Sequence, residues 1–259
     1  MSTLHCEGLR VRVAGRTLLD ALDFGVAAGE LVGIVGANGA GKSTLFKALL
    51  GILPADCGTI TVDGQPLASL HATTRARRIA YLAQGHAAHW PLSVREVVTL
   101  GRLPHVRSAR DEAIVEQMLR ATDLAHLAHR NVLTLSGGER ARTMLARALA
   151  VTPAVLLADE PLAALDPAHQ LRIMQLLREQ TRQGLGVGIV LHDLPLAARF
   201  CTRLVLLHEG RVLASGTPCD VLNDAALATA FGIGVARFSF EGAQVPLPWT
   251  LTPAPLAGA

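Results

Sequence analysis

A glycine-rich loop that joins a buried strand to a helix constrains the fold of this chain more than any other feature. The run Glu30–Gly36 is apolar after its first residue, which is typical of a strand buried on both faces of a parallel sheet. The run Lys42–Leu50 has helical spacing, and Gly51 with Pro54 ends it. Between the two, Gly36–Thr44 fits the pattern G-x-x-x-x-G-K-[ST]. This arrangement predicts a strand–loop–helix unit in a parallel sheet.

The chemistry of this loop favours the phosphates of a nucleotide. Glycines let the backbone turn inward and aim N–H groups at a β-phosphate, and the following helix adds the positive end of its dipole. The Lys42 ammonium then reaches the β and γ oxygens, and the Ser43 hydroxyl binds Mg²⁺. A chance match in a chain rich in glycine and alanine is the alternative, and the flanking strand and helix argue against it. The predicted nucleotide site comprises Gly36, Ala37, Asn38, Gly39, Ala40, Gly41, Lys42, Ser43 and Thr44.

A second strand supplies the acidic groups that such a site requires. The apolar run Ala154–Ala158 carries Asp159 and Glu160 to the carboxyl edge of the sheet, where α/β proteins bind their ligands. We expect Asp159 to hold Mg²⁺ through water and Glu160 to polarise the attacking water. By itself this pattern is more typical of a strand that ends in a solvated acidic turn. The glycine-rich loop in the same chain favours the catalytic interpretation.

The rest of the chain alternates strands with helices, which indicates an α/β fold with a parallel sheet and right-handed crossovers. The first two strands instead show the polar–apolar alternation of antiparallel, half-buried strands. These first two strands are expected at Leu9–Val13 and Leu18–Val26. Further strands are expected at Cys57–Asp63, Ile79–Ala83, Val187–Leu191, Leu204–Leu207, Arg211–Ala214 and Val235–Phe240. Later helices are expected from Ser136 to about Ala150, over Pro167–Gln183 and over Leu194–Cys201.

We predict a single domain over residues 1–259 with two distinctive segments. The first, about residues 85–135, lacks any buried-strand pattern and reads as a helical subdomain. It begins with a capping box at Ser93–Glu96 and is broken at Pro104. The second is a tail over about residues 233–259 whose proline-rich end is expected to be disordered.

Composition excludes several classes of protein. A net charge of +3 and an aromatic content of 3% give no basic or stacking surface for nucleic acid. The longest charge-free apolar runs, of which Ala148–Ala158 is one, are shorter than the roughly 20 residues that a spanning helix needs. The residues after Met1 lack the basic start and apolar core of a signal peptide. These features predict a cytoplasmic location and reduced thiols at the four cysteines.

A second anion cradle follows about a hundred residues after the first. Leu135–Glu139 reads Leu-Ser-Gly-Gly-Glu and opens a helix, with Ser136, Gly137 and Gly138 as donors to an anion. An ordinary serine N-cap is the simpler interpretation. However, the chain already has a phosphate loop, and a second cradle is explained if it serves the nucleotide of another subunit. A two-fold dimer in which each loop faces the cradle of its partner would bury two ATP molecules.

With these motifs together, the chain resembles the ATPase subunits of ABC transporters, from about residue 4 to residue 233. Leu135–Glu139 matches the signature of that family without a departure. The resemblance implies the ABC ATPase fold, a P-loop NTPase core joined to an antiparallel β subdomain and a helical subdomain, with ATP and Mg²⁺ as cofactors. It also implies that Gln84 is a switch glutamine near Mg²⁺, that Asp166 lies in a loop crossing the dimer interface, and that His192 contacts the γ-phosphate.

One departure from the family concerns the base of the nucleotide. The family usually has an aromatic residue near Val13 that stacks on adenine, and no aromatic residue stands there. Either nucleobase selectivity is loose or another residue covers the ring. The segment Arg140–Arg142 also differs from relatives that have glutamine after the signature, and we expect this to matter little.

Within the family, two segments resemble importers of iron–siderophores, haem and cobalamin: Val97–His105 and Leu191–Cys201. The resemblance implies a homodimer bound to multi-span permease subunits at the cytoplasmic face of the inner membrane, served by a periplasmic or extracellular substrate-binding protein. The alternatives are a soluble ABC ATPase acting in cluster assembly or another non-transport role, and a non-hydrolysing clamp. Glu160 and His192 argue against a clamp.

Trp90 is the last residue that the sequence singles out. It lies in a loop between Gly85 and Pro91, where a large aromatic side chain is more often packed at an interface than left in water. By resemblance, a groove beside the helical subdomain receives a short helix of the permease, and Trp90 would belong to it. A local core contact is the alternative.

Overall fold

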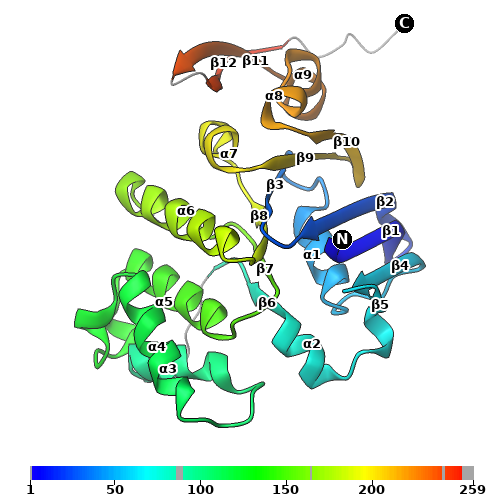
Figure 1. The fold of residues 1–259 in the computed structure, drawn as a ribbon. Helices are drawn as coiled ribbons and strands as arrows, with labels where there is room; N and C mark the ends of the chain where they lie inside the picture. The colour runs from blue at the N-terminus through cyan, green and yellow to red at the C-terminus, as the bar shows by residue number, and fades with distance from the viewer. Residues whose placement is uncertain (1, 86–89, 164, 241–242, 253–259) are drawn as a thin grey trace, which may run out of the picture.

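A computed structural model describes the chain apart from residues 1, 86–89, 164, 241–242 and 253–259 (Figure 1). The described residues form three sheets with helices between and around them. No helix within the described ranges combines the length and apolar character that crossing a membrane requires.

A six-stranded sheet forms the centre of the molecule, in the order β10-β9-β3-β8-β7-β6. The strands from β9 to β6 pair in parallel and β10 pairs antiparallel to β9. The bounds are β3 (Leu31–Val35), β6 (Ile79–Leu82), β7 (Val155–Ala158), β8 (Gly186–Val190), β9 (Arg203–His208) and β10 (Arg211–Gly216). The predicted parallel sheet is therefore confirmed, with strand ends within about two residues of those expected from the sequence.

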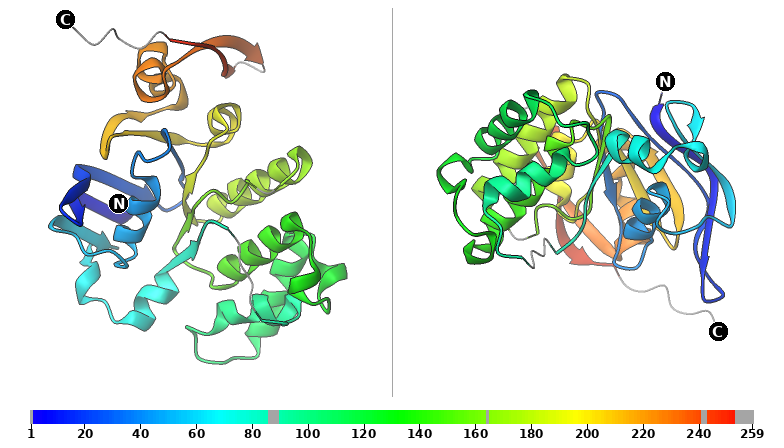
Figure 2. Two further views of the ribbon diagram at one scale, coloured as in Figure 1. Left: turned by 180° about the vertical axis from the view of Figure 1, so that it is seen from behind. Right: turned by 90° about the horizontal axis from the view of Figure 1, so that it is seen from below.

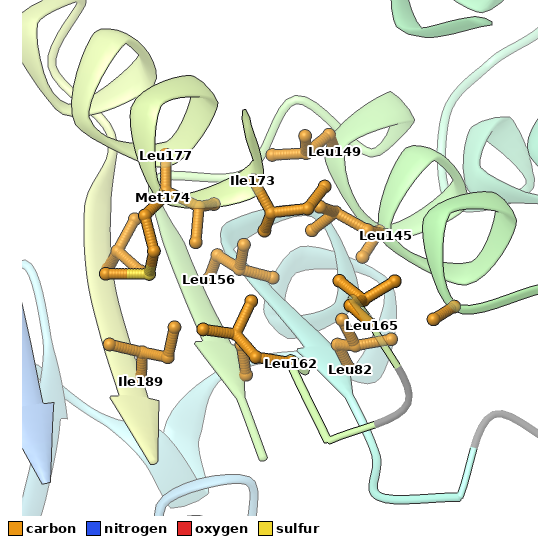
Figure 3. Packing of buried hydrophobic residues seen from close by; sticks show 14 of the residues in the cluster. Leu82, Leu145, Leu149, Leu156, Leu162, Leu165, Ile173, Met174, Leu177 and Ile189 are labelled. Atoms are coloured by element: carbon orange, nitrogen blue, oxygen red, sulfur yellow. The ribbon is translucent and has the colours of Figure 1, made fainter. Parts of the chain in front are cut away.

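Both faces of the central strands are buried, which explains their continuous apolar runs. In β7, Leu156 packs with α5 (Gly137–Ala150) and α6 (Pro167–Arg182), whereas Leu157 faces the opposite cluster around α1 (Lys42–Leu49). Figure 3 shows Leu145 and Leu149 of α5 and Ile173 of α6 meeting above these strands. The two helices that follow the signature and the acidic strand are thus fixed to the same core.

An antiparallel sheet covers α1 on the other side of the molecule, in the order β2-β1-β4-β5. Its strands are β1 (Ser2–Val13), β2 (Arg16–Ala27), β4 (Cys57–Val62) and β5 (Gln65–Pro66). The first two pair antiparallel, as their alternation predicts. A short connection through η1 (Leu67–Ser69) and α2 (Ala72–Arg78), neither of which the sequence predicted, leads back to β6.

Short helices fill the stretch for which a helical subdomain is predicted, and they lie away from the antiparallel sheet (Figure 2). They are α3 (Val94–Thr99), η2 (Leu100–Arg102), α4 (Arg110–Ala121), η3 (Ala125–Leu127) and η4 (Val132–Thr134). The capping box between Ser93 and Glu96 is present. The α-helix ends at Thr99, five residues before the predicted break at Pro104, and η2 continues as a tighter turn to Arg102.

The C-terminal part corrects the sequence prediction. After α7 (Leu194–Phe200), β9 and β10, the chain forms α8 (Pro218–Val221) and α9 (Asp224–Phe231), which were not predicted. The predicted strand is present as β11 (Ile233–Phe240), but it pairs with β12 (Ala243–Leu251) in a stretch expected to be disordered. Pro246 and Pro248 are tolerated because the hairpin is a two-stranded sheet with free edges. The last part of the tail, residues 253–259, for which disorder is also expected, lies outside the described residues.

Candidate active site

The glycine-rich loop joins β3 to α1 in a conformation that depends on glycine. Gly36 has a φ of 153°, and a Cβ atom there would lie 2.3 Å from the carbonyl oxygen of Leu207. Gly41 has a φ of 103° and precedes α1 as an N-cap that has no side chain to bond the first turn. The first N–H groups of α1 are therefore available to an anion, and the loop passes close to its neighbours.

Lys42 lies folded over the loop, with its ammonium against the backbone. Its Nζ donates to the carbonyl oxygens of Gly36 at 2.7 Å and Ala37 at 2.9 Å. Burial lowers the pKa of Lys42, while the charges of Glu160 and Asp159 act in the opposite direction. The positive charge is thus held over the loop and near both acids.

A cavity of about 880 Å³ opens beside the loop. Its lining comes from β2, the loop and α1, and from the turns that follow β6, β7, β8 and β9. The lining residues are Thr17, Leu18, Asn38, Gly39, Gly41, Lys42, Ser43, Thr44, Gln84, Glu160, His192, Glu209 and Gly210. The cavity therefore unites the phosphate loop with all three residues that the sequence predicted as catalytic.

Glu160 is the point where these residues meet. Gln84 Nε2 donates to Glu160 Oε2 at 2.7 Å, and His192 Nε2 lies 2.7 Å from Glu160 Oε1. The three residues follow β6, β7 and β8, which are neighbours in the sheet, so their carboxyl ends meet at one edge. This arrangement can hold a water molecule between an acid and two polar side chains.

Asp159 lies one residue deeper than Glu160. It is 2% exposed, and its Oδ1 is buried with no hydrogen-bond partner in the described part of the chain. Its Oδ2 accepts a hydrogen bond from Tyr81 Oη at 3.4 Å. An unpaired buried carboxylate oxygen is costly unless a further partner satisfies it, which fits a cation or its water shell.

The second cradle and the predicted interface loop lie outside this cavity. Ser136 caps α5, accepting from the N–H of Glu139 at 3.2 Å in a capping box. Asp166 caps α6 and accepts from the N–H of His169 at 2.9 Å; this contact and the His169 ring hold the pKa of Asp166 below its usual value. Gly137, Gly138 and Asp166 are therefore ordered at helix starts but do not join the cavity of their own chain.

Sequence reasoning missed the cavity lining that comes from β2 and from the turn after β9. Thr17 and Leu18 begin β2, and Glu209 with Gly210 forms the turn after β9. A Cβ atom at Gly210 would lie 2.4 Å from the carbonyl oxygen of Leu18, so this turn packs directly on β2. The sequence predicted the turn but gave no sign that it lined a site. Among the described residues that line the cavity, none is a phenylalanine, tyrosine or tryptophan.

Comparison with known proteins now identifies the family. The model of the ABC transporter family matches residues 19–163, which include the loop, the signature and the acidic strand. The chain belongs to this family. The resemblance inferred from the sequence is thereby confirmed, and so are the ABC ATPase fold and the binding of ATP that defines the family.

Two ABC relatives and two solved ABC structures illustrate the similarity. The hemin import ATP-binding protein HmuV of Nocardia farcinica is 44% identical, over 95% of this chain and 89% of its own length. The cobalamin import ATP-binding protein BtuD of Halobacterium salinarum is 42% identical, over 90% of this chain and 60% of its own length. A solved ATP-binding subunit of an ABC transporter superposes with a TM-score of 0.78 at 30% identity, covering 85% of this chain and 92% of that one. The ATP-binding cassette MJ0796, solved as a dimer with ADP and Pi, has a TM-score of 0.74 at 26% identity. The match covers 83% of this chain and 98% of that one.

Proposed function

We propose that this chain is the ATP-hydrolysing subunit of an ABC importer that takes up haem, cobalamin or an iron chelate. The observation that carries the hydrolytic part is the contact of Gln84 and His192 with the two oxygens of Glu160 beside the phosphate loop. The names of the relatives, which import hemin and cobalamin, support the transport part. The same names favour the importer over the alternative, a soluble ABC ATPase in cluster assembly or another non-transport role.

The phosphate loop is proposed to bind ATP with its own backbone. The N–H groups of the loop and of the first turn of α1 would point at the β-phosphate. The Lys42 ammonium, which now donates to Gly36 and Ala37, would exchange these carbonyls for β and γ oxygens. Phosphate oxygens are stronger acceptors than neutral carbonyls, so the exchange favours binding. Asn38, Gly39 and Thr44 line the same cavity as Lys42.

The residues present fit a Mg²⁺ ion. The unpartnered Oδ1 of Asp159 offers a buried anionic oxygen, and Ser43 and Gln84 line the cavity nearby. Mg²⁺ prefers oxygen ligands and keeps several waters, so one carboxylate, one hydroxyl and the phosphates suffice. When bound, the ion would neutralise the negative charge that develops on the phosphates during hydrolysis.

Glu160 is proposed as the general base and its two partners as positioning groups. A water molecule hydrogen-bonded to a Glu160 oxygen would lie in line with the γ-phosphate held by Lys42. Gln84 would orient this water, and His192 would contact the γ-phosphate while it restrains the Glu160 side chain. Proton transfer from this water to Glu160 would then accompany its attack on the γ-phosphorus. The bond from that phosphorus to the β–γ bridging oxygen would break, leaving ADP and inorganic phosphate.

The proposal includes a homodimer in which each chain completes the site of the other. Ser136, Gly137, Gly138 and Asp166 are ordered at helix starts outside the cavity of their own chain. In a head-to-tail dimer these residues would close the cavity of the partner over the γ-phosphate. Permease subunits, a substrate-binding protein and a place at the cytoplasmic face of the membrane follow from the importer proposal. Nucleic acid has no part in it.

The change Glu160→Gln tests the hydrolytic proposal. We expect turnover to fall by about 10²–10⁴ because the base is lost, while ATP still binds. The variant should also elute as a dimer with ATP on a sizing column, since the closed dimer can no longer hydrolyse its nucleotide. Glu179→Gln on the exposed face of α6 is the matched control and should hydrolyse ATP normally. Turnover near that of the wild type in Glu160→Gln would contradict the assignment.

The transport part needs a separate experiment. Purification of the tagged chain from native membranes should bring down a multi-span protein. Recovery of a soluble assembly with no such protein would favour the cluster-assembly alternative.

A further inference from the structure

The only tyrosine of the chain, Tyr81, lies beside Asp159 at the carboxyl ends of two neighbouring strands. β6 and β7 are parallel, with Leu82 opposite Ala158, so Tyr81 and Asp159 flank this pair. The phenol Oη of Tyr81 donates to Asp159 Oδ2 at 3.4 Å. Tyr81 therefore contacts a residue of the proposed metal site, although no motif in the sequence marks it.

The carboxylate of Asp159 has few other restraints. Its side chain is buried, and within the described ranges its Oδ1 has no hydrogen-bond partner. The backbone N–H of Asp159 is bonded to the carbonyl oxygen of Leu82 at 2.8 Å, which fixes the main chain but not the carboxylate plane. The phenol of Tyr81 thus distinguishes the two carboxylate oxygens: it engages one and leaves the other for a different partner.

The ring of Tyr81 is itself held in place. It meets the ring of Phe46 edge to face, with centroids 6.5 Å apart and planes at 85°. Phe46 is fully buried on α1, the helix that begins with Lys42 and Ser43. Because its ring packs against α1 and its hydroxyl bonds Asp159, Tyr81 can hold the acid and the loop in one geometry.

We propose that Tyr81 is a positioning residue for Mg²⁺: it orients Asp159 so that Oδ1 faces the water shell of the ion that accompanies ATP. This inference rests on the proposed function. Groups that orient a metal ligand through a hydrogen bond typically affect metal affinity by about 10–100-fold. Asp159 acts through water, so we expect an effect near the lower limit of that range.

The test is the change Tyr81→Phe, which removes the hydroxyl and keeps the ring against Phe46. Both it and its parent carry Glu160→Gln, so that hydrolysis does not disturb the measurement. Binding of an ATP analogue labelled on the ribose is followed by fluorescence anisotropy, first in EDTA and then during titration with MgCl₂. We expect the same affinity in EDTA within about twofold, and a Mg²⁺ half-saturation about tenfold higher in Tyr81→Phe.

Each outcome has a distinct meaning. An unchanged Mg²⁺ half-saturation in Tyr81→Phe would overturn the inference and leave Tyr81 as a packing residue. An equal loss of affinity with and without Mg²⁺ would also overturn it, because the hydroxyl would then act on the nucleotide or on folding. If the parent itself shows no Mg²⁺-dependent binding, the proposed function fails and the inference fails with it.

Kinetics in the otherwise wild-type chain separate positioning from general damage. ATP turnover of Tyr81→Phe should be low at limiting Mg²⁺ and return to within about threefold of the wild type at saturating Mg²⁺. Tyr81→Leu, which also loses the ring contact with Phe46, should lower the melting temperature. Tyr81→Phe should melt as the wild type does. A turnover defect in Tyr81→Phe that saturating Mg²⁺ does not relieve would contradict a role through Asp159.

Discussion

Glu160 holds a backbone conformation that non-glycine residues seldom adopt, with a φ of 51°. Such a conformation costs of order 1–3 kcal/mol and persists only where the surroundings enforce it. Here Gln84 and His192 each lie 2.7 Å from one of its oxygens. The sequence predicted all three as catalytic, but not their contact, because a motif fixes order along the chain and only the folded sheet brings three strand ends together.

Lys42 is one of two lysines in the chain, and both lie on α1. We expect Lys42→Ala to weaken ATP binding about 10- to 100-fold, since hydrogen bonds to charged groups contribute about 1.5–3 kcal/mol. The loss should appear in ATP affinity itself and not only in turnover. Titration calorimetry on the isolated subunit measures it.

Lys47 provides the matched control for this change. It is exposed in the last turn of α1, five residues from Lys42 and away from the cavity lining. Lys47→Ala should bind ATP as the wild type does. An unchanged affinity in Lys42→Ala would remove the basis for the phosphate-loop assignment.

At the scale of elements, the sequence predicted the helices and strands whose apolar spacing is regular. The buried runs of β3 and β7 and the helices α1, α5 and α6 were all predictable because their apolar spacing agrees with their burial. α9 was missed although Asn223 caps its start and Gly232 ends it in the left-handed conformation. β12 could not be predicted, because its prolines argue against a strand and only pairing with β11 overrides them.

The start of α5 carries the proposed contact with a second nucleotide. We expect Ser136→Arg to abolish hydrolysis while the monomer still binds ATP, because the cation would fill the cradle meant for the γ-phosphate of the partner. ATPase and binding assays on the same variant measure the two effects. Normal turnover in Ser136→Arg would mean that the cradle is only a helix cap.

Ser93 is a control with the same local structure, since it caps α3 in a capping box with Glu96. Ser93→Arg should lose a similar cap contribution, about 1 kcal/mol, and keep its hydrolysis. A further test mixes Ser136→Arg chains with Lys42→Ala chains. In that heterodimer one composite site carries both faults and the other is intact, so partial activity should return if the two sites act independently.

At the scale of the whole molecule, the described chain divides its functional groups between two surfaces. The cavity holds the loop, Glu160 and His192, whereas Ser136 and Asp166 begin helices elsewhere. The sequence predicted both groups of residues, and it predicted a dimer in which each group faces the other group of the partner chain. It could not predict the part of the cavity lined by Leu18 and Gly210, because aliphatic and turn residues carry no recognisable chemistry.

The contact with the membrane partner is the prediction that involves the whole assembly. Trp90 is 72% exposed, so the structure favours a surface role over the core contact that its sequence left open. We expect Trp90→Ala to keep basal ATP hydrolysis within a few-fold, yet to weaken assembly with the permease and uptake of substrate. The chain offers a matched control, because its other tryptophan, Trp249 on β12, is 71% exposed. Pull-down and uptake assays, run beside an ATPase assay, should therefore show weaker permease assembly and uptake for Trp90→Ala than for Trp249→Ala. Equal assembly of the two variants would exclude Trp90 from the docking surface.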